Sequence, residues 1–231
     1  MHCPIELVYE HADFYVFNKP AGCDFHDDQG QSGFFSLVKQ AYPSETLYPV
    51  HRLDKETSGL LIVARHLSAE HALKHCFQNH LINKYYLAIG PAKARKKQGC
   101  IKGDMQRSRN KSWRLLKSQQ HAAITYFKSF SLTPGKRLYL LKPISGKTHQ
   151  LRVMMKSIAA PIDGDCIYKG ENSSRLHLHA AYLDFMYSGA RIQIVALPQQ
   201  AGFSAITEFV KHQPWLTEPW ALDWPAGADC Q

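Results

Sequence analysis

The stretch HRLDKETSGLLIVAR, residues 51–65, joins a charged half to an apolar half. Its continuous apolar run, residues 60–64, predicts a strand that is buried on both faces. Thr57, Ser58 and Gly59 predict a turn just before this strand. Asp54 therefore lies on a loop that a rigid sheet would hold in place, and catalytic side chains are often placed in this way.

The charges around Asp54 distinguish it from an ordinary surface acid. His51, Arg52 and Lys55 surround it with basic groups, and nearby positive charge favours the ionised form of a carboxylate, whose ordinary pKa is about 3.9. An ionised carboxylate in such surroundings can serve as a nucleophile or a base towards an anionic substrate. The alternative interpretation is a surface Asp that only caps the turn.

The overall charge also points to an anionic partner. The 231 residues include 28 Lys and Arg against 19 Asp and Glu, a net charge of +9. This balance favours nucleic acid as the partner, with an anionic membrane surface as the second choice. No stretch approaches the roughly 20 apolar residues of a membrane span, and the N-terminus lacks the pattern of a signal peptide. We therefore expect a cytoplasmic protein.

The hydrophobic content and the cysteine pattern indicate a protein with a packed core and reduced thiols. Hydrophobic residues make up 45% of the chain, enough for one sizeable core or for two subdomains that share one. The cysteines show no C-x-x-C pair, which predicts reduced thiols rather than a disulfide framework or a zinc site. The six are Cys3, Cys23, Cys76, Cys100, Cys166 and Cys230.

Many short strands alternate with a few short helices. Strands are predicted at 7–9, 14–17, 84–89, 122–131 and 137–141, and helices at 32–42, from 67, from 148 and at 203–211. Ser32, Ser68 and Thr148 are expected to cap the first three helices. Three aromatic residues of the tail, Trp215, Trp220 and Trp224, are expected to cover the body of the protein.

Residues 93–117 form the most basic part of the chain, with ten basic residues and one acid, Asp104. A charged run is usually a solvated face, but this one also carries an aromatic residue that can stack on a base. We therefore expect an arm or hairpin that grips RNA phosphates. Its proposed contacts are Arg107, Arg109, Lys111, Trp113 and Arg114.

Two pairs of histidines have spacings that a metal can use. His71 and His75 lie four apart on a predicted helix, and His177 and His179 alternate on a predicted strand. Neither pair has an evident third ligand, and the first is not the H-E-x-x-H arrangement. We expect polar or structural roles, or phosphate contact for the second pair, and no metal.

Several segments together resemble the RluA-type pseudouridine synthases. Residues 51–61 meet every fixed position of the pattern H-R-L-D-x-x-T-S-G-L-L, and LVYEHADFYVFNKPAG at 7–22 resembles the first motif of the catalytic domain. KYYLA at 84–88 matches K-x-Y-x-A. GKTHQLRVM at 146–154 resembles G-R-T-H-Q-I-R-V-H, with Lys147 in place of Arg and Met154 in place of His. APIDGDCIY at 160–168 resembles H-P-I-x-G-D-x-x-Y, with Ala160 in place of His.

The resemblance implies an isomerase that converts a uridine in ribosomal or transfer RNA to pseudouridine without a cofactor or metal. It implies an α+β fold in which a mixed, mostly antiparallel, twisted sheet runs through two subdomains, with helices on the flanks and a central cleft. We expect one catalytic domain over residues 1–231, a monomer, with no room for the small S4 domain that many relatives carry in front.

The resemblance also implies roles for individual residues. Asp54 is the expected catalytic carboxylate, Arg152 pairs with it, and Tyr86 stacks on the flipped uracil. Whether Asp54 attacks the base, attacks C1′ or removes a ribose proton stays open. The expected substrate contacts are Arg52, Leu178, Lys147, His51 and Thr57.

Two alternatives come from other classes of protein. A non-catalytic RNA-binding protein on the same scaffold would keep the basic arm, but the set Asp54, Tyr86 and Arg152 argues against it. A phosphotransferase is suggested faintly by the order His51, Arg52, Leu53, Asp54, but the chain has no glycine-rich phosphate loop and no Asp-Phe-Gly.

Overall fold

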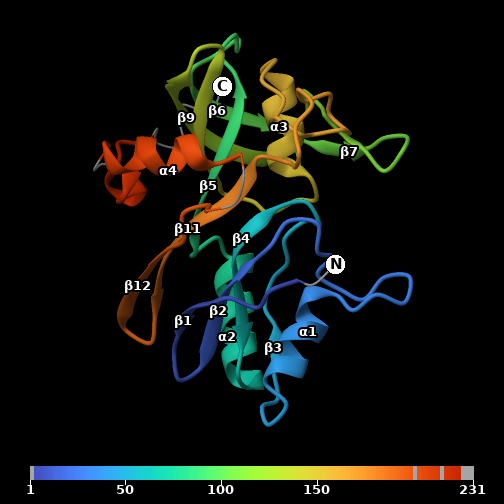
Figure 1. Cartoon of the computed structure of the whole chain (residues 1–231), viewed down its shortest axis with the longest axis vertical. Helices are drawn as coiled ribbons and strands as arrows, with labels where there is room; N and C mark the ends of the chain where they lie inside the picture. Colours follow the sequence, from blue (N-terminus) through green and yellow to red (C-terminus); the bar gives the residue numbers. More distant parts are fainter. Residues whose placement is uncertain (1–2, 200–201, 214–215, 225–231) are drawn as a thin grey trace. The chain divides into compact units, whose positions relative to one another are not determined.

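The computed structural model describes residues 3–199, 202–213 and 216–224. The chain folds into two compact units, each built from antiparallel strands and helices (Figure 1). The first unit contains the described residues up to Ile82 together with Ala180–Ala196, and the second contains Asn83–His179 with the described residues from Leu197 onward. The predicted α+β class with a mostly antiparallel sheet is confirmed.

The first unit is built on the strand that the sequence singles out. β4 (Ser58–Ala64) is buried along its whole length, as predicted, and it pairs with β2 (Phe14–Lys19) and β3 (Tyr48–Pro49). The sheet runs in the order β1, β2, β4, β11, and β12 pairs with β11. The other elements are β1 (Leu7–Glu10), β11 (Leu178–Tyr187), β12 (Ala190–Val195), α1 (Phe34–Ala41) and α2 (Leu67–Gln78).

The core of the first unit joins the buried faces of β2, β4 and β11 to α2. Alternate side chains of β2 and β4 enter it, as the period of two along a strand requires, and α2 adds Ala69 and Leu73 from its apolar face. Its central members are Phe14, Val16, Leu60, Ile62, Leu73, Leu183 and Phe185.

Four strands of the second unit pair antiparallel in the order β5, β10, β9, β6. These strands are β5 (Asn83–Pro91), β10 (Lys136–Pro143), β9 (Ala123–Thr133) and β6 (Gln98–Gly103). A separate hairpin is formed by β7 (Met105–Arg107) and β8 (Trp113–Leu115). The helices are α3 (Gln150–Ser157) and α4 (Ser204–Lys211), followed by a short 3-10 helix at Pro219–Ala221. β5, β9, β10 and α4 lie where the sequence predicts them, whereas β6 was not predicted as a strand.

Two of the predicted helix caps are wrong. Gly33, not Ser32, is the N-cap of α1, and the N–H of Gly33 donates to Oδ1 of Asp27 at 2.8 Å. His66, not Ser68, is the N-cap of α2, and its Nδ1 accepts the backbone N–H three residues later at 3.2 Å. In both cases the local path of the chain before the helix decides which group reaches the first turn, and a hydroxyl residue nearby is not enough.

The third predicted cap is also wrong, but the apolar stripe of that helix is confirmed. α3 begins at Gln150, and its N-cap is His149 in the left-handed conformation, with φ of 57°. The side chain of Thr148 therefore does not cap the helix. The stripe Leu151, Met154, Met155 and Ile158 is buried in the core of the second unit.

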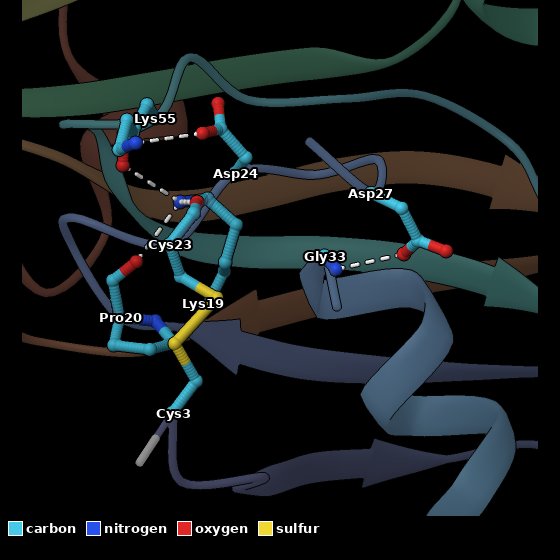
Figure 2. The surroundings of a disulfide bond; sticks show 8 residues. All are labelled: Cys3, Lys19, Pro20, Cys23, Asp24, Asp27, Gly33 and Lys55. Carbon is cyan, nitrogen blue, oxygen red and sulfur yellow. Dashed lines mark hydrogen bonds and ion pairs between the residues drawn. A yellow bond between two sulfur atoms is a disulfide. The ribbon is translucent and has the colours of Figure 1, made fainter. Parts of the chain in front are cut away.

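The prediction that all cysteines are reduced is wrong for Cys3 and Cys23, which form a disulfide (Figure 2). The N-terminal segment folds back so that the two Cα atoms lie 6.5 Å apart, although 20 positions separate them in the sequence. Such an approach depends on the path of the chain and cannot be read from cysteine spacing. Cys76 and Cys166 are free thiols.

The described part of the tail covers the sheet, as predicted. The ring of Trp224 lies 5.7 Å from that of Tyr85, and its Nε1 donates to the carbonyl oxygen of Pro219 at 2.7 Å. Trp220 is half-buried, and Trp215 lies outside the described residues. None of the helices in the described ranges has the length and apolar character needed to span a membrane.

Candidate active site

The Asp54 loop connects β3 to β4 in the first unit. The N–H of Thr57 donates to the carbonyl oxygen of Asp54 at 3.0 Å, which closes the predicted turn. Leu53 and Thr57 are buried, whereas Asp54 is half-buried and Arg52 is exposed. The loop therefore anchors on its apolar and hydroxyl side chains and leaves its charged side chains at or near the surface. The burial of Thr57 fits a role in shaping the loop, and its expected contact with substrate stays a prediction.

A buried lysine fixes this loop from behind. Lys19 has no exposed surface, and its Nζ donates to the carbonyl oxygens of Pro20 at 2.9 Å, Cys23 at 2.8 Å and Lys55 at 3.1 Å (Figure 2). The N–H of Gly22 donates to the same carbonyl of Lys55 at 2.9 Å. Because it is fully buried, Lys19 is neither a solvated strand end nor a contact for phosphate. Charge-assisted hydrogen bonds of this kind hold the backbone beside Asp54 in one position.

The turn meets the sheet at a glycine that cannot be replaced without strain. Gly59 has φ of +116°, and a Cβ there would lie 2.2 Å from the carbonyl oxygen of Ala180 on β11. Such a contact with backbone requires the strands to move apart. Gly59 thus lets β4 approach β11 closely at the point where the Asp54 loop ends.

His51 and Lys55 have structural partners in the same unit. Nε2 of His51 accepts the N–H of Ile62 at 2.9 Å, and its ring stacks on Phe77 with centroids 4.3 Å apart. Nζ of Lys55 pairs with the carboxylate of Asp24 at 2.8 Å. The ring of His51 is thus part of the packing under β4, and its expected contact with substrate stays a prediction.

The two tyrosines of β5 point to opposite faces, as predicted. Tyr85 is buried beside Trp224, whereas Tyr86 is half-buried and packs against the core of the second unit. Leu178, which is 3% exposed, belongs to the same core. The structure therefore brings Tyr86 and Leu178, two residues expected to contact the base, to one apolar cluster.

Arg152 is held by an acid that sequence reasoning did not single out. Its Nε donates to Oδ2 of Asp165 at 2.7 Å and its Nη2 to Oδ1 at 2.9 Å, with the guanidinium 6% and the carboxylate 0% exposed. The guanidinium carbon also lies 5.2 Å from the centroid of the Tyr168 ring. A bidentate pair of this kind fixes both the position and the plane of the guanidinium. The signal available in the sequence was the G-D-x-x-Y segment, which contains both Asp165 and Tyr168. The expected pairing of Arg152 with Asp54 stays a prediction.

The three departures from the family pattern have local explanations. Met154 and Ala160 have no exposed surface and lie in the apolar core of the second unit, where an imidazole would need a hydrogen-bonding partner. Nζ of Lys147 donates to the carbonyl oxygen of His121, and its backbone N–H donates to Oε1 of Gln150 at 3.0 Å. Lys147 thus ties the segment before α3 to the chain just after the basic region. Its expected contact with substrate stays a prediction.

Part of the basic region forms the hairpin of β7 and β8, in which Arg107 faces Trp113. Arg107, Arg109, Lys111 and Arg114 are exposed, and Trp113 is half-buried. Nε and Nη2 of Arg114 donate to Oε1 of Gln106 on the opposite strand. The tip of the hairpin therefore presents positive charge to solvent, which is what contact with phosphates requires.

The base of this hairpin is fixed to the body of the second unit. Met105 and Leu115, which face each other across the two strands, pack against the core that contains α3. The hydroxyl of Ser118 and the backbone N–H groups of His121 and Gln120 hold the pKa of Asp104 below its ordinary value. Asp104, the one acid of the basic region, thus holds the chain at the foot of the hairpin in place.

The predicted structural roles of the second histidine pair agree with their burial. His177 is 6% and His179 is 2% exposed, and their rings lie 5.0 and 6.2 Å from that of Phe203. Burial lowers the pKa of His177. On the first pair, Nε2 of His71 lies 3.5 Å from the carboxylate of Glu70. Within the described ranges, no three His, Cys, Asp or Glu side chains gather closely enough to hold a metal ion.

Comparison with known proteins is consistent with these motifs. A family model described as RNA pseudouridylate synthase matches residues 13–157. A protein of Haemophilus influenzae named as an uncharacterized RNA pseudouridine synthase is 43% identical over 219 residues, which cover 93% of this chain and 97% of that protein. Ribosomal large subunit pseudouridine synthase C of Rickettsia bellii is 35% identical over 187 residues, which cover 75% of this chain and 61% of the relative.

Two solved human structures share the fold. RNA Pseudouridylate Synthase Domain Containing 1 superposes with a TM-score of 0.74 at 22% identity, covering 96% of this chain and 97% of the other. RNA Pseudouridylate Synthase Domain Containing 4 gives a TM-score of 0.72 at 23% identity, covering 89% and 93%. At this level of identity the likeness concerns the fold alone.

Proposed function

Because the chain belongs to the RNA pseudouridylate synthase family, among its RluA-type members, we propose that it isomerises a specific uridine in ribosomal or transfer RNA to pseudouridine in the cytoplasm. In this reaction the bond between N1 and C1′ breaks, the uracil turns, and a bond between C5 and C1′ forms. N1 gains a proton and C5 loses one, so the atoms balance without an oxidant or reductant. The observation that carries the proposal is the complete H-R-L-D-x-x-T-S-G-L-L loop, which lies within the residues that the family model matches, 13–157.

In this proposal Asp54 is the catalytic carboxylate. Asp54 is half-buried, and its own carbonyl oxygen closes the turn on which it lies. Lys19 holds the backbone of the next residue, Lys55. These contacts support a side chain that is held in one place. Arg152 orients the carboxylate and keeps it ionised. Tyr86 stacks on the uracil and Leu178 packs against it, which their shared apolar cluster supports. Arg52, exposed on the same loop, holds a phosphate or fills the gap that the base leaves.

The hairpin supplies the contacts to the RNA backbone. Its exposed Arg107, Arg109, Lys111 and Arg114 give a sequence-independent grip whose strength falls as salt rises. Trp113 offers an aromatic face to a base. The target uridine has to leave its stack, which costs a few kcal/mol and is easiest where the base already lies in a loop. A strong backbone grip offsets that cost.

Ribosomal RNA is the favoured substrate class. Relatives from Rickettsia bellii and Borreliella burgdorferi are named for the ribosomal large subunit, at 35% and 34% identity. The match covers 61% and 55% of those two proteins, so they carry sequence that this comparison does not reach. Mapping pseudouridine in total RNA from cells with and without the gene identifies the target: loss of one site in the large ribosomal subunit supports this choice, and loss of a transfer RNA site overturns it.

The activity is tested by following tritium released from C5 of uridine-labelled RNA. Asp54→Asn removes the carboxylate charge with little change in shape, and we expect it to abolish release while the protein still folds and binds RNA. Glu56→Gln, two residues along the same loop, makes the same change of charge and should leave release intact. Turnover retained by Asp54→Asn would refute the assignment. RNA binding without turnover by the unmodified chain, on the RNA that the map identifies, would favour the non-catalytic alternative.

A further inference from the structure

We propose that Tyr168 is a positioning residue that couples the RNA-binding hairpin to Arg152. The inference deepens the proposed function and rests on it, because it takes the hairpin as the RNA grip and Arg152 as the group that orients the carboxylate of Asp54. Tyr168 lies in the loop between α3 and β11. Three kinds of contact, made by its hydroxyl, its ring and its backbone, connect these two parts of the second unit.

The hydroxyl of Tyr168 reaches the hairpin. The backbone N–H of Trp113, the first residue of β8, donates to this hydroxyl at 2.9 Å. Trp113 faces Arg107 across the two strands, so the contact lies where the basic tip joins the paired part of the hairpin. Because this contact is made by the backbone of β8, it depends on the path of the strand and not on the identity of one side chain.

The ring and backbone of Tyr168 reach Arg152. The guanidinium carbon lies 5.2 Å from the ring centroid, within the range of a cation–π contact. The N–H of Tyr168 donates at 3.1 Å to Oδ1 of Asp165, the same oxygen that accepts Nη2 of Arg152. A shift of Tyr168 therefore disturbs both the face of the guanidinium and the carboxylate that holds its edge.

The same hydroxyl also holds the start of α3. It lies 2.9 Å from Nδ1 of His149, the left-handed residue that begins the helix three positions before Arg152. A tyrosine hydroxyl has one donor and can accept as well, so it can accept the N–H of Trp113 and bond His149 at the same time. The hairpin, the helix that carries Arg152 and the carboxylate that orients Arg152 thus meet at one side chain.

Through these contacts, binding of RNA at the hairpin can affect the position of Arg152 and so the rate of the reaction. RNA phosphates held at the tip of the hairpin restrain β8, β8 restrains the Tyr168 hydroxyl, and Tyr168 keeps Arg152 in its bidentate pair. The base of the hairpin stays in the core through Met105 and Leu115 in any case. We therefore expect loss of the hydroxyl to lower kcat more than it raises KM.

Tyr168→Phe tests the link, because it removes the hydroxyl and keeps the ring over Arg152. We expect hydrogen exchange of the Trp113 amide to accelerate by at least tenfold in the free protein, and kcat for tritium release to fall roughly 3- to 10-fold, as loss of one hydrogen bond predicts, with KM changed less than twofold. Tyr139→Phe is the matched control. Tyr139 is buried in the same core and donates its hydroxyl to the carbonyl of Pro91 at 2.7 Å, so it should lose stability without changing kcat or the exchange of Trp113.

A second measurement separates coupling from simple weakening of the fold. Arg109→Ala removes a charge at the tip of the hairpin. In the otherwise unchanged chain it should raise KM, lower kcat and shift the NMR signal of the Arg152 Nε–H in the RNA complex. In the Tyr168→Phe background it should only raise KM. Equal effects on kcat and on the Arg152 signal in both backgrounds would overturn the proposal.

Failure of the proposed function gives a different pattern. If the unmodified chain releases no tritium, the enzymatic proposal fails, while the exchange of Trp113 and the signal of Arg152 still decide whether Tyr168 links them. Unchanged exchange of Trp113 in Tyr168→Phe overturns the link whatever the activity. An equal fall of kcat in Tyr139→Phe overturns it as well, because the effect would then come from the core in general.

Discussion

Replacing Asp165 by Asn tests how Arg152 is held in place. Oδ1 of Asp165 accepts Nη2 of Arg152 at 2.9 Å and the backbone N–H groups of Ile167 and Tyr168, both at 3.1 Å, while Oδ2 accepts Nε of Arg152 at 2.7 Å. An Asn side chain can keep the contacts of Oδ1. It places an NH₂ group opposite the Nε–H, so that two donors face each other, and it removes the negative charge.

The burial of the pair sets the size of the effect. The carboxylate is fully buried and the guanidinium is 6% exposed, so water cannot readily replace the lost partner. Removing one member of a buried ion pair costs about 3–5 kcal/mol. Because Asn retains the contacts of Oδ1, we expect a loss at the lower end, about 3 kcal/mol, which changes the unfolding equilibrium on the order of a hundredfold.

Urea unfolding followed by circular dichroism measures this loss as a change in the free energy of unfolding at constant m-value. Glu208→Gln is the control, because Glu208 pairs with Lys211 at 3.6 Å with both side chains more than 60% exposed, and loss of such a pair should leave the midpoint unchanged. A loss below about 1 kcal/mol in Asp165→Asn would show that the buried pair contributes little, and that Arg152 is held mainly by its other contacts.

Two further predictions concern Gly59 on β4 and Lys84 on β5. Gly59→Ala should destabilise the chain by at least about 2 kcal/mol, from backbone strain together with the contact with Ala180. Gly135 also has a positive φ, of +79°, but open space around the position of a Cβ, so Gly135→Ala should cost less. Equal urea midpoints for the two variants would contradict the role of close approach. Burial lowers the pKa of Lys84 from 10.5 to about 8. The unfolded chain therefore binds more protons between these pH values, and the stability of the fold should rise with pH across that window. Lys84→Met should remove the rise, and an unchanged pH profile of the melting temperature in that variant would refute the assignment.

The sequence predicts best where one property decides the structure. β4 is recognisable because residues 60–64 are all apolar, and the stripe of α3 is recognisable because Leu151, Met154 and Met155 recur at helical spacing. Both patterns are local. An arm or hairpin is likewise expected from a dense run of charge around one aromatic residue, but neither the choice between them nor the pairing of Arg107 with Trp113 is.

Three features that sequence reasoning missed depend on close approach between parts of the chain that are separated in the sequence. Lys19 holds the carbonyl of Lys55, 36 positions away, and no property of Lys19 itself distinguishes that role from a solvated strand end. The Cys3–Cys23 disulfide depends on the return of the N-terminal segment. Asp165 lies in a quoted motif, but its bond to Arg152 requires the loop after α3 to fold back along the helix.

The geometry of the Asp165 pair also explains why position 152 suits arginine. A guanidinium has five N–H donors in one plane. The bond pair with Asp165 uses Nε–H and one N–H of Nη2, and the other three N–H bonds point away from that carboxylate. One edge of the side chain can therefore be fixed to the core while the other edge presents donors in a defined plane. A lysine ammonium can bond two carboxylates, but it has no plane that a bidentate pair could fix. A group proposed to orient a second carboxylate, Asp54, needs one fixed edge and one edge with donors. The donors of a loosely held side chain would have no fixed direction and could not orient that carboxylate.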